Sequence, residues 1–354
     1  MIDEVKSYTA GYIRYCYHNW RQITKDPWVL DIVSKGLRLD FTELPEGQNS
    51  HSHPLSSAED QIISEEITKL LSKKVIVETV REENDFVSGV FTRDKKDNSK
   101  RMILNLKKLN MSIEYQHFKM EHINDVLNII KPNAYLASVD LKDAFYSVPI
   151  HNEHQKYLKF RANDHLYQFI SLPNGYGPAM RVFTKLLKVP FSYLRKKGHL
   201  SVVYVDDTFL QGDSYSECMA NVLDTINLLR YLGFTIHAEK SILKPTKQMI
   251  FLGFIFDSAN MTISVTDEKK LKIKEACTSL ISNKKPTIRE VASVIGKLVS
   301  SFPGVPFGPL NYRHIEQDKI LALKYNKGNF EKKMSLTEAA LTELHWWSNN
   351  IMLA

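Results

Sequence analysis

The chain has 354 residues, of which 43% are hydrophobic and 25% charged, so it is long enough to bury one large core or two to three subdomains. Its 47 lysines and arginines exceed its 40 aspartates and glutamates only mildly, which suits phosphate binding but does not establish it. The three scattered cysteines argue against a disulfide framework. No segment reaches the roughly 18 apolar residues of a membrane span. We therefore expect an intracellular protein, cytoplasmic or nuclear, that is neither secreted nor membrane-bound.

Residues 1–56 are predicted to be an N-terminal extension that ends in a linker. Trp20 and Trp28 are expected to pack onto the main body, and the polar segment 46–57 reads as a loop. From Ser57, isoleucines and leucines at helical spacing predict a helix. Short apolar runs then predict the strands Val75–Val80, Val87–Thr92 and Met102–Leu106, with a charged turn at 93–100 between the last two.

The rest of the chain predicts a sheet with helices, followed by a helical C-terminal third. The expected elements are a strand at Tyr135–Val139, a helix at Phe183–Leu194, a hairpin with arms Leu200–Val205 and Thr208–Gln211, a helix from Met219 to Leu229 and a strand at Phe251–Phe256. Farther on, Thr287 with Glu290 and Ser335 with Glu338 fit helix capping boxes. The order predicts an α+β fold.

The strongest chemical signal is Tyr204-Val205-Asp206-Asp207, between the two arms of the predicted hairpin. Two adjacent carboxylates at a hairpin tip repel each other, and divalent cations relieve that repulsion. Taken alone, the same four residues are equally compatible with a plain Asp-Asp turn.

A second carboxylate cluster favours the metal site. Asp140 ends an apolar strand and Asp143 follows it in a turn or helix start. Asp140 and Asp206 on neighbouring strands can share two magnesium ions, which together activate a hydroxyl and stabilise a leaving oxygen in an in-line displacement. Because magnesium keeps phosphate oxygens and waters in its shell, two or three carboxylates suffice.

Four motifs in a fixed order resemble the reverse transcriptase family between about Phe86 and Phe256. Asp140 is similar to the family's first metal-binding aspartate, and Asp206-Asp207 to its paired aspartates. The segment from Leu172 to Ala179, with Asn174 and Gly175, resembles the template- and nucleotide-binding motif. Leu252, Gly253 and Phe254 resemble part of the hairpin that grips the primer. Asn174 departs from the residues often found there.

The resemblance also implies roles for single residues. Arg101 matches an arginine that contacts the incoming triphosphate, whereas the family's fingers lysine has no clean counterpart and falls on Asp94. Asp143 and Ala144 match positions whose amides touch the phosphates. Phe145 matches the aromatic residue that excludes a ribose 2′-hydroxyl; as an alternative it is a core residue. Lys240 matches a lysine that protonates or neutralises the pyrophosphate, or it is simply solvated.

The C-terminal third resembles the DIRS group of tyrosine-recombinase retrotransposons. The matching segments are Gly296–Val305 and Glu343–Trp347. An RNase H domain usually comes next in such elements, and no second set of spaced acidic residues on a strand-rich pattern is present. We therefore expect a polymerase region without its nuclease.

The resemblance implies a right-hand polymerase: fingers, a palm with an antiparallel sheet, and an α-rich thumb. The expected domains are the extension at 1–56, fingers and palm at 57–265, and thumb with the start of a connection region at 266–354. Two Mg²⁺ ions, a primed RNA or DNA template and deoxynucleoside triphosphates are the expected cofactor and partners. Two alternatives stay open, a non-catalytic nucleic-acid-binding remnant and an RNA-dependent RNA polymerase. The sequence does not give the oligomeric state.

Overall fold

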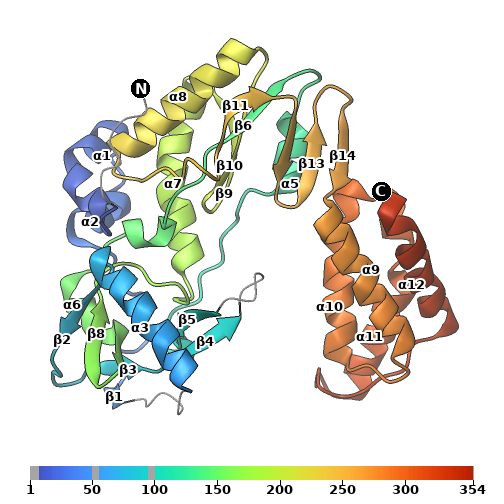
Figure 1. The fold of residues 1–354 in the computed structure, drawn as a ribbon, viewed down its shortest axis with the longest axis horizontal. Helices are drawn as coiled ribbons and strands as arrows, with labels where there is room; N and C mark the ends of the chain where they lie inside the picture. Colours follow the sequence, from blue (N-terminus) through green and yellow to red (C-terminus); the bar gives the residue numbers. More distant parts are fainter. Residues whose placement is uncertain (1–7, 50–55, 95–99, 354) are drawn as a thin grey trace. The chain divides into compact units, whose positions relative to one another are not determined.

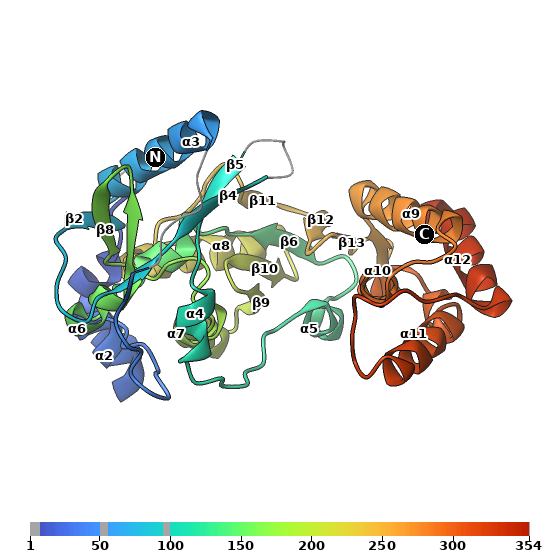
Figure 2. The same cartoon turned by 90° about the horizontal axis from the view of Figure 1, so that it is seen from below.

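The computed structural model describes residues 8–49, 56–94 and 100–353, without the side chains of Asn49 and Arg101. Parts of the predicted linker and of the charged turn, including Lys95, lie outside the described residues. None of the described helices combines the length and hydropathy that a membrane crossing requires. Figures 1 and 2 show the chain in two views.

Two compact units divide the chain. The first consists of Met1–His122, Ala137–Gly212 and Ser216–Lys244, and the second of Ile123–Leu136, Asp213–Tyr215 and Pro245–Ala354. These units differ from the three segments expected from the sequence, because residues 1–56 group with residues 57–122 and residues 245–265 group with the C-terminal helices. The functional division into fingers, palm and thumb stays a prediction.

The first unit begins with three short helices that surround Trp20. They are η1 (Tyr12–Cys16), α1 (Tyr17–Ile23) and α2 (Pro27–Lys35). Trp20 is fully buried, and its indole Nε1 donates a hydrogen bond to the Leu232 carbonyl at 2.9 Å. Its ring meets Phe234 edge to face. The predicted packing of Trp20 onto the main body is thereby confirmed, and it ties the extension to the end of a helix more than 200 residues away.

A five-stranded sheet in the order β1-β3-β7-β8-β2 comes next, with parallel pairing at β1–β3–β7 and antiparallel pairing at β7–β8–β2. Its strands are β1 (Gln48–Asn49), β2 (Ile76–Thr79), β3 (Phe86–Ser88), β7 (Lys159–Ala162) and β8 (His165–Phe169). A separate ribbon of β4 (Val90–Asp94) and β5 (Lys100–Leu104) lies beside α3 (Ser57–Ser72), as Figure 2 shows. The single strand predicted at Val87–Thr92 is therefore wrong: it is two strands, each paired in a different sheet.

The helix predicted from Ser57 is confirmed as α3. Ser56 caps it, and the Glu59 carboxylate accepts a hydrogen bond from the Ser56 amide in return, which completes a capping box. The shorter helical elements of the first unit are α4 (Lys107–Met111), η2 (Ala144–Ser147), α6 (Asn152–Gln155) and η3 (Lys156–Leu158).

A four-stranded sheet in the order β11-β6-β10-β9 carries the acidic motifs. Its strands are β6 (Tyr135–Ser138), β9 (Leu200–Tyr204), β10 (Asp207–Gly212) and β11 (Ile242–Thr246). Helix α7 (Ala179–Lys196) packs against β9, and α8 (Tyr215–Tyr231) follows β10 (Figure 1). The predicted strand at Tyr135, both helices and the hairpin are confirmed. Gly233, at φ +95°, ends the turn after α8.

The second unit contains α5 (Ile123–Ile129), a three-stranded antiparallel sheet and a bundle of four longer helices. The strands are β12 (Gln248–Phe251), β13 (Phe254–Asp257) and β14 (Thr262–Val265). The helices are α9 (Asp267–Ser282), α10 (Ile288–Val299), α11 (Arg313–Tyr325) and α12 (Glu338–Asn350), with short turns η4 (Phe302–Gly304), η5 (Gly308–Leu310) and η6 (Ile351–Leu353). After β14, every regular element of the described chain is helical.

Two details of this unit differ from the sequence prediction. The strand expected at Phe251–Phe256 is broken by a turn, because Leu252 and Gly253 both have positive φ. The capping box at Thr287–Glu290 is confirmed, but the one expected at Ser335–Glu338 is wrong. Thr337 caps α12 instead, since its hydroxyl accepts from the Ala340 amide and donates to Asp318.

Candidate active site

The hairpin of β9 and β10 presents Asp206 at a two-residue turn. Tyr204 pairs with Asp207, so Val205 and Asp206 form the turn. Val205 has φ +55° and is buried. A β-branched residue in the left-handed region is a backbone outlier with a cost of about 1–2 kcal/mol, so burial of its side chain must help to hold the turn.

Asp140 follows β6 and is held by a segment about a hundred residues later. Its amide donates to the Ser241 hydroxyl at 2.9 Å, and its carbonyl accepts from the His237 amide at 2.8 Å. Next to it, Leu141 bridges to Ile236. This pairing brings the segment that carries Lys240 to the strand end that carries Asp140.

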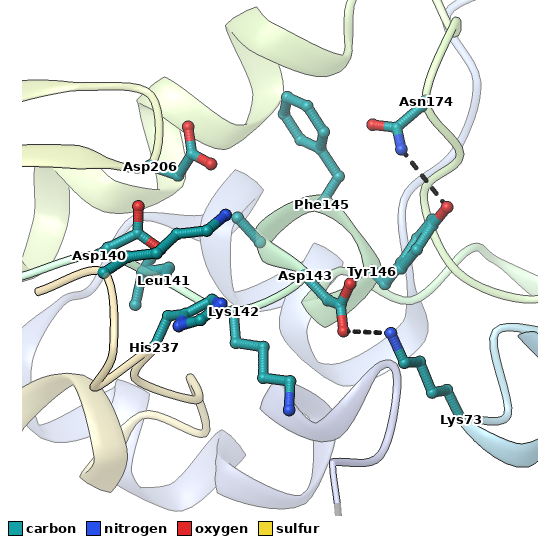
Figure 3. Close-up of a pocket in the computed structure, with 12 residues that line it drawn as sticks. Lys73, Asp140, Leu141, Lys142, Asp143, Phe145, Tyr146, Asn174, Asp206 and His237 are labelled. Atoms are coloured by element: carbon teal, nitrogen blue, oxygen red, sulfur yellow. Dashed lines mark hydrogen bonds and ion pairs between the residues drawn. The ribbon is translucent and has the colours of Figure 1, made fainter. Parts of the chain in front are cut away.

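These segments enclose a cavity of about 390 Å³. Seven residues expected from the sequence line it: Asp140, Asp143, Ala144, Phe145, Asn174, Asp206 and Lys240. In Figure 3, Asp140 and Asp206 lie at one end, Lys73 and Asn174 at the other, and Phe145 and Asp143 between them. The structure thus gathers residues from five separate places in the sequence into one cavity.

The cavity has four further polar or charged residues that the sequence reasoning missed as site residues: Lys73, Lys142, Tyr146 and His237. Lys142 and Tyr146 stand within or directly after the motif that begins at Asp140, and His237 precedes Lys240 by three residues, so proximity in the chain was an available signal. No sequence signal marked Lys73, because Lys73 is far from the motifs in the chain and only folding brings it to the cavity.

Electrostatic repulsion between carboxylates is a feature of the site. Burial, then the charge of Asp206, raises the pKa of Asp140, and Lys240 and His237 partly oppose that rise. Asp207 begins β10 and does not line the cavity, and much of its surface is exposed. Even so, partial burial of the carboxyl group, then the charges of Asp206 and Asp140, raise the pKa of Asp207 to about 6.

The aspartates fit a divalent cation in one specific respect. Oδ1 of Asp140 is buried and has no hydrogen-bond partner among the described residues. A buried carboxylate oxygen without a partner is costly, and a cation removes that cost. Within the described part of the chain, no three acidic, histidine or cysteine side chains form a ready-made metal cluster. Magnesium usually completes its coordination shell with waters and phosphate oxygens.

Phe145 and the turn before it form the middle of the cavity. The Phe145 ring, which is half-buried, meets the buried Phe183 ring of α7 edge to face at 5.4 Å. Asp143 has φ +50°, and its carboxylate forms an ion pair with Lys73 at 2.7 Å. No described residue accepts a hydrogen bond from the amides of Asp143, Ala144 or Phe145. These amides are free for an anionic ligand.

The loop with Asn174 and Gly175 is fixed by a single side chain on α4. The side-chain Nδ2 of Asn110 donates to the Gly175 carbonyl at 2.8 Å, and the side-chain Oδ1 of Asn110 accepts from the Gly177 backbone amide at 2.9 Å. Asn174 itself is exposed and donates to the Tyr146 hydroxyl at 3.4 Å. Gly175 has φ +99° and does not line the cavity.

The remaining predicted site residues lie elsewhere. Arg101 is on β5 opposite Arg93, and its side chain lies outside the part that the structure describes. Leu252, Gly253 and Phe254 form the turn between β12 and β13 and the start of β13, in the second unit. There the Lys269 ammonium lies over the Phe254 ring at 4.1 Å.

Residues 88–256 match the family model described as "Reverse transcriptase (RNA-dependent DNA polymerase)". The matched range includes all the cavity residues except Lys73. Residues 88–256, just under half of the chain, are thus similar to reverse transcriptases. Domains of this kind occur in retrotransposon and retroviral polyproteins.

Three relatives are examples. The chain is 22% identical over 215 residues to the Pol polyprotein of transposon 412 from Drosophila melanogaster, covering 60% of this chain and 17% of the relative. It is 26% identical over 174 residues to the Gag-Pol polyprotein of avian reticuloendotheliosis virus, covering 46% and 15%. It is 23% identical over 211 residues to the transposon Tf2-3 polyprotein of Schizosaccharomyces pombe, covering 60% of this chain and 15% of the relative. The chain thus spans less than a fifth of each relative.

Solved reverse transcriptase structures are similar along nearly the whole chain. The foamy viral protease-reverse transcriptase dRH in complex with double-stranded DNA has a TM-score of 0.68 at 16% identity, covering 99% of this chain and 62% of that one. The same viral enzyme with an RNA/DNA hybrid gives 0.66 at 17% identity, covering 99% and 47%. The predicted α+β polymerase fold is confirmed.

Proposed function

We propose that the chain is an RNA-directed DNA polymerase, which adds deoxynucleotides to a primer 3′ end as a template directs. One observation carries the proposal: Asp140, Asp206, Phe145 and the free amides of Asp143 and Ala144 line a single cavity within the reverse transcriptase domain. The cavity offers carboxylates for metal at one end and amides for phosphate in its middle.

In this proposal Asp140, Asp206 and Asp207 hold two Mg²⁺ ions. When bound, such ions activate the primer hydroxyl and stabilise charge on the leaving oxygen. The buried, unpartnered Oδ1 of Asp140 and the raised pKa values of Asp140 and Asp207 support this assignment, since a cation relieves both the missing contact and the repulsion.

The chain's other residues position the substrates and neutralise charge. The primer 3′ oxygen forms a bond to the α-phosphorus of the nucleotide, the bond to pyrophosphate breaks, and the hydroxyl proton passes to solvent water. Asp143 and Ala144 bind phosphates through their amides, Asn174 and Gly175 border the nucleotide, and Lys240 protonates or neutralises pyrophosphate. Positioning and charge neutralisation together lower the barrier.

Three further roles rest on the sequence resemblance. Arg101 contacts the triphosphate, and Leu252, Gly253 and Phe254 grip the primer. The partners are a primed RNA or DNA template and deoxynucleoside triphosphates. The foamy viral structures, with double-stranded DNA in one and an RNA/DNA hybrid in another, support nucleic acid as the partner class.

Primer extension by the purified chain tests the proposal. RNA and DNA templates, each with deoxy- and ribonucleotides, are supplied with MgCl₂ or with EDTA. We expect magnesium-dependent addition of deoxynucleotides on RNA templates. Addition of ribonucleotides only would assign the chain to RNA polymerases, and binding without extension would make it a non-catalytic remnant.

We also propose that the gene belongs to a DIRS-type element. Both segments that carry this resemblance contribute buried side chains to the second unit, among them Leu298 and Trp347. Trp347 of α12 is fully buried, stacks against Phe302 at 6.3 Å, and lies where a Cβ on Gly308 would be 2.7 Å from its ring. Sequencing the flanking DNA tests the proposal: a tyrosine recombinase frame supports it, and an integrase frame contradicts it.

A further inference from the structure

The start of the described chain contacts the turn that separates the two ends of the cavity. The Tyr8 hydroxyl donates to the Asp143 carbonyl at 3.1 Å, and the Gly11 amide donates to the Tyr146 carbonyl at 2.7 Å. Between them, the Ala10 amide donates to the Lys73 carbonyl at 3.0 Å. Three successive contacts therefore fasten this segment to three cavity residues, which Figure 3 shows side by side.

The turn has a backbone that needs such support. Asp143 adopts the left-handed region at φ +50°, which residues other than glycine rarely occupy. The contacts from Tyr8 and Gly11 reach the carbonyls of Asp143 and Tyr146, at the start and near the end of the turn. Gly11 is itself at φ +64°, and a Cβ there would lie 3.3 Å from Cβ of Pro149.

Tyr8 also acts on the charged pair beside the turn. Its ring lies 5.8 Å from the Lys73 ammonium, which forms the 2.7 Å ion pair with Asp143. Burial, then the Asp143 carboxylate, raises the pKa of Tyr8, so the hydroxyl stays protonated and remains a donor. One side chain thus contacts the backbone of the turn and the cation that neutralises its carboxylate.

We propose that Tyr8 is a positioning residue for the incoming nucleotide, which it serves by holding the Asp143–Tyr146 turn so that the free amides of Asp143 and Ala144 stay arranged for phosphate. The inference rests on the proposed function. It gives the N-terminal segment, which lies outside the matched range 88–256, a part in substrate binding.

The contacts of Tyr8 predict which kinetic constant changes. Asp140 and Asp206 are held by other groups: Ser241 and His237 contact the backbone of Asp140, and the β9–β10 pairing forms the Asp206 turn. A loosened Asp143 turn therefore weakens binding of the nucleotide and leaves the carboxylates in place. The change falls on KM for the nucleotide more than on kcat.

The kinetic experiment compares Tyr8→Phe with the parent and with Tyr15→Phe, a control at a side chain 73% exposed in the same segment. Loss of a partly buried hydroxyl contact should raise KM for deoxynucleotides roughly three- to tenfold, with kcat within about twofold of the parent. Gly11→Ala disturbs the contact of the Gly11 amide with the Tyr146 carbonyl and should also raise KM for deoxynucleotides. An unchanged KM in Tyr8→Phe, or an equal change in Tyr15→Phe, would overturn the inference.

Hydrogen exchange measured by mass spectrometry gives a second readout that does not need activity. The amides of Tyr146 and Val148, which donate to the Asp143 and Phe145 carbonyls, should exchange several-fold faster in Tyr8→Phe, with α10 unchanged, because the contact that holds the turn is lost. If the parent fails to extend primers, the proposed function fails and the role in nucleotide binding fails with it, whereas the exchange experiment still decides whether Tyr8 holds the turn. Equal exchange in parent and Tyr8→Phe would overturn it.

Discussion

The hydroxyl of Thr208 accepts a hydrogen bond from the Val139 amide and donates one to the Val139 carbonyl, both at 2.7 Å. Thr208 is almost fully buried, directly after Asp207, and Val139 directly precedes Asp140. One side chain therefore links the neighbouring strand ends that carry the acidic residues, in sequence regions about 70 residues apart.

The isosteric change Thr208→Val should weaken both the fold and the chemistry. It leaves two buried backbone groups of Val139 without that partner, at a cost of about 1–3 kcal/mol in the free energy of unfolding. Urea unfolding and primer extension measure the two effects. Thr208→Ser keeps the hydroxyl and should retain most of both properties. If Thr208→Val extends primers as well as Thr208→Ser does, the link between the strands is unimportant for the reaction.

Asp140→Asn and Asp206→Asn should each abolish extension and leave primer-template binding nearly intact. Binding rests on many phosphate contacts, whereas the reaction needs both ions. Extension with MgCl₂ and filter binding measure the two properties. Asp164→Asn, at an exposed turn of the first unit, is the matched control and should behave as the parent. Near-normal extension by either cavity variant would refute the two-metal assignment.

The stability of the metal-free protein should depend on pH through Asp207. Its pKa is raised in the folded state to about 6 from an ordinary 3.8, so the folded state holds more protons than the unfolded state between these values. Stability therefore falls as the pH rises through this window and stays lower above it.

Asp207→Asn removes that loss and should be more stable than the parent at pH 7.5, with the difference shrinking towards pH 4. Urea unfolding in EDTA at several pH values measures this. Adding MgCl₂ at pH 7.5 should stabilise the parent more than Asp207→Asn. A pH-independent difference between the two proteins would show that repulsion among the aspartates does not burden the fold.

Phe145→Val should increase ribonucleotide incorporation relative to deoxynucleotide incorporation. The smaller side chain opens space for the 2′-hydroxyl, and DNA synthesis should suffer less because the ring acts by exclusion. Single-nucleotide extension with each substrate measures the ratio. Phe183→Leu removes the ring that supports Phe145 and serves as a packing control, which should slow both substrates together. An unchanged ratio in Phe145→Val would make Phe145 a core residue only.

The chain 1–354 should not cleave the RNA strand of an RNA–DNA hybrid. Such cleavage needs a further carboxylate cluster that holds two ions about 4 Å apart. In the C-terminal helices Glu343 is committed elsewhere, since its carboxylate accepts from the amides of His314 and Ile315 at 3.1 Å. A labelled hybrid with magnesium tests this, with Asp206→Asn as the control. Cleavage that persists in that control and is lost in Glu338→Gln would contradict the expectation.

The sequence predicted the cavity better than it predicted the surroundings of the cavity. Asp140, Phe145, Asp206 and Lys240 could be found because short motifs and their order mark them. Tyr8 and Lys73 could not, because only the fold brings them to Asp143, and no local pattern encodes such a contact. Asp207 does not line the cavity, yet Asp206 and Asp140 lie close enough to raise its pKa.

The errors in secondary structure have a similar origin. Apolar periodicity located the β12–β13 segment but not the turn at Leu252-Gly253, since left-handed backbone at leucine has no signature in hydrophobicity. Ser335 and Glu338 have the right spacing for a capping box. Thr337 caps the helix instead, because it also hydrogen-bonds to the Asp318 carboxylate. Tertiary contacts decided both cases.

The pairing of Asp140 with Ser241 and His237 has a consequence for biosynthesis. A ribosome that has delivered the Asp206-Asp207 hairpin has made every proposed metal ligand, but not the segment that fixes the backbone of Asp140. The backbone contacts of Asp140, the first proposed metal ligand, therefore become available only after about thirty-five more residues, counted from Asp206 to Ser241. A nascent chain interrupted in that interval carries the full acidic motif and no finished site.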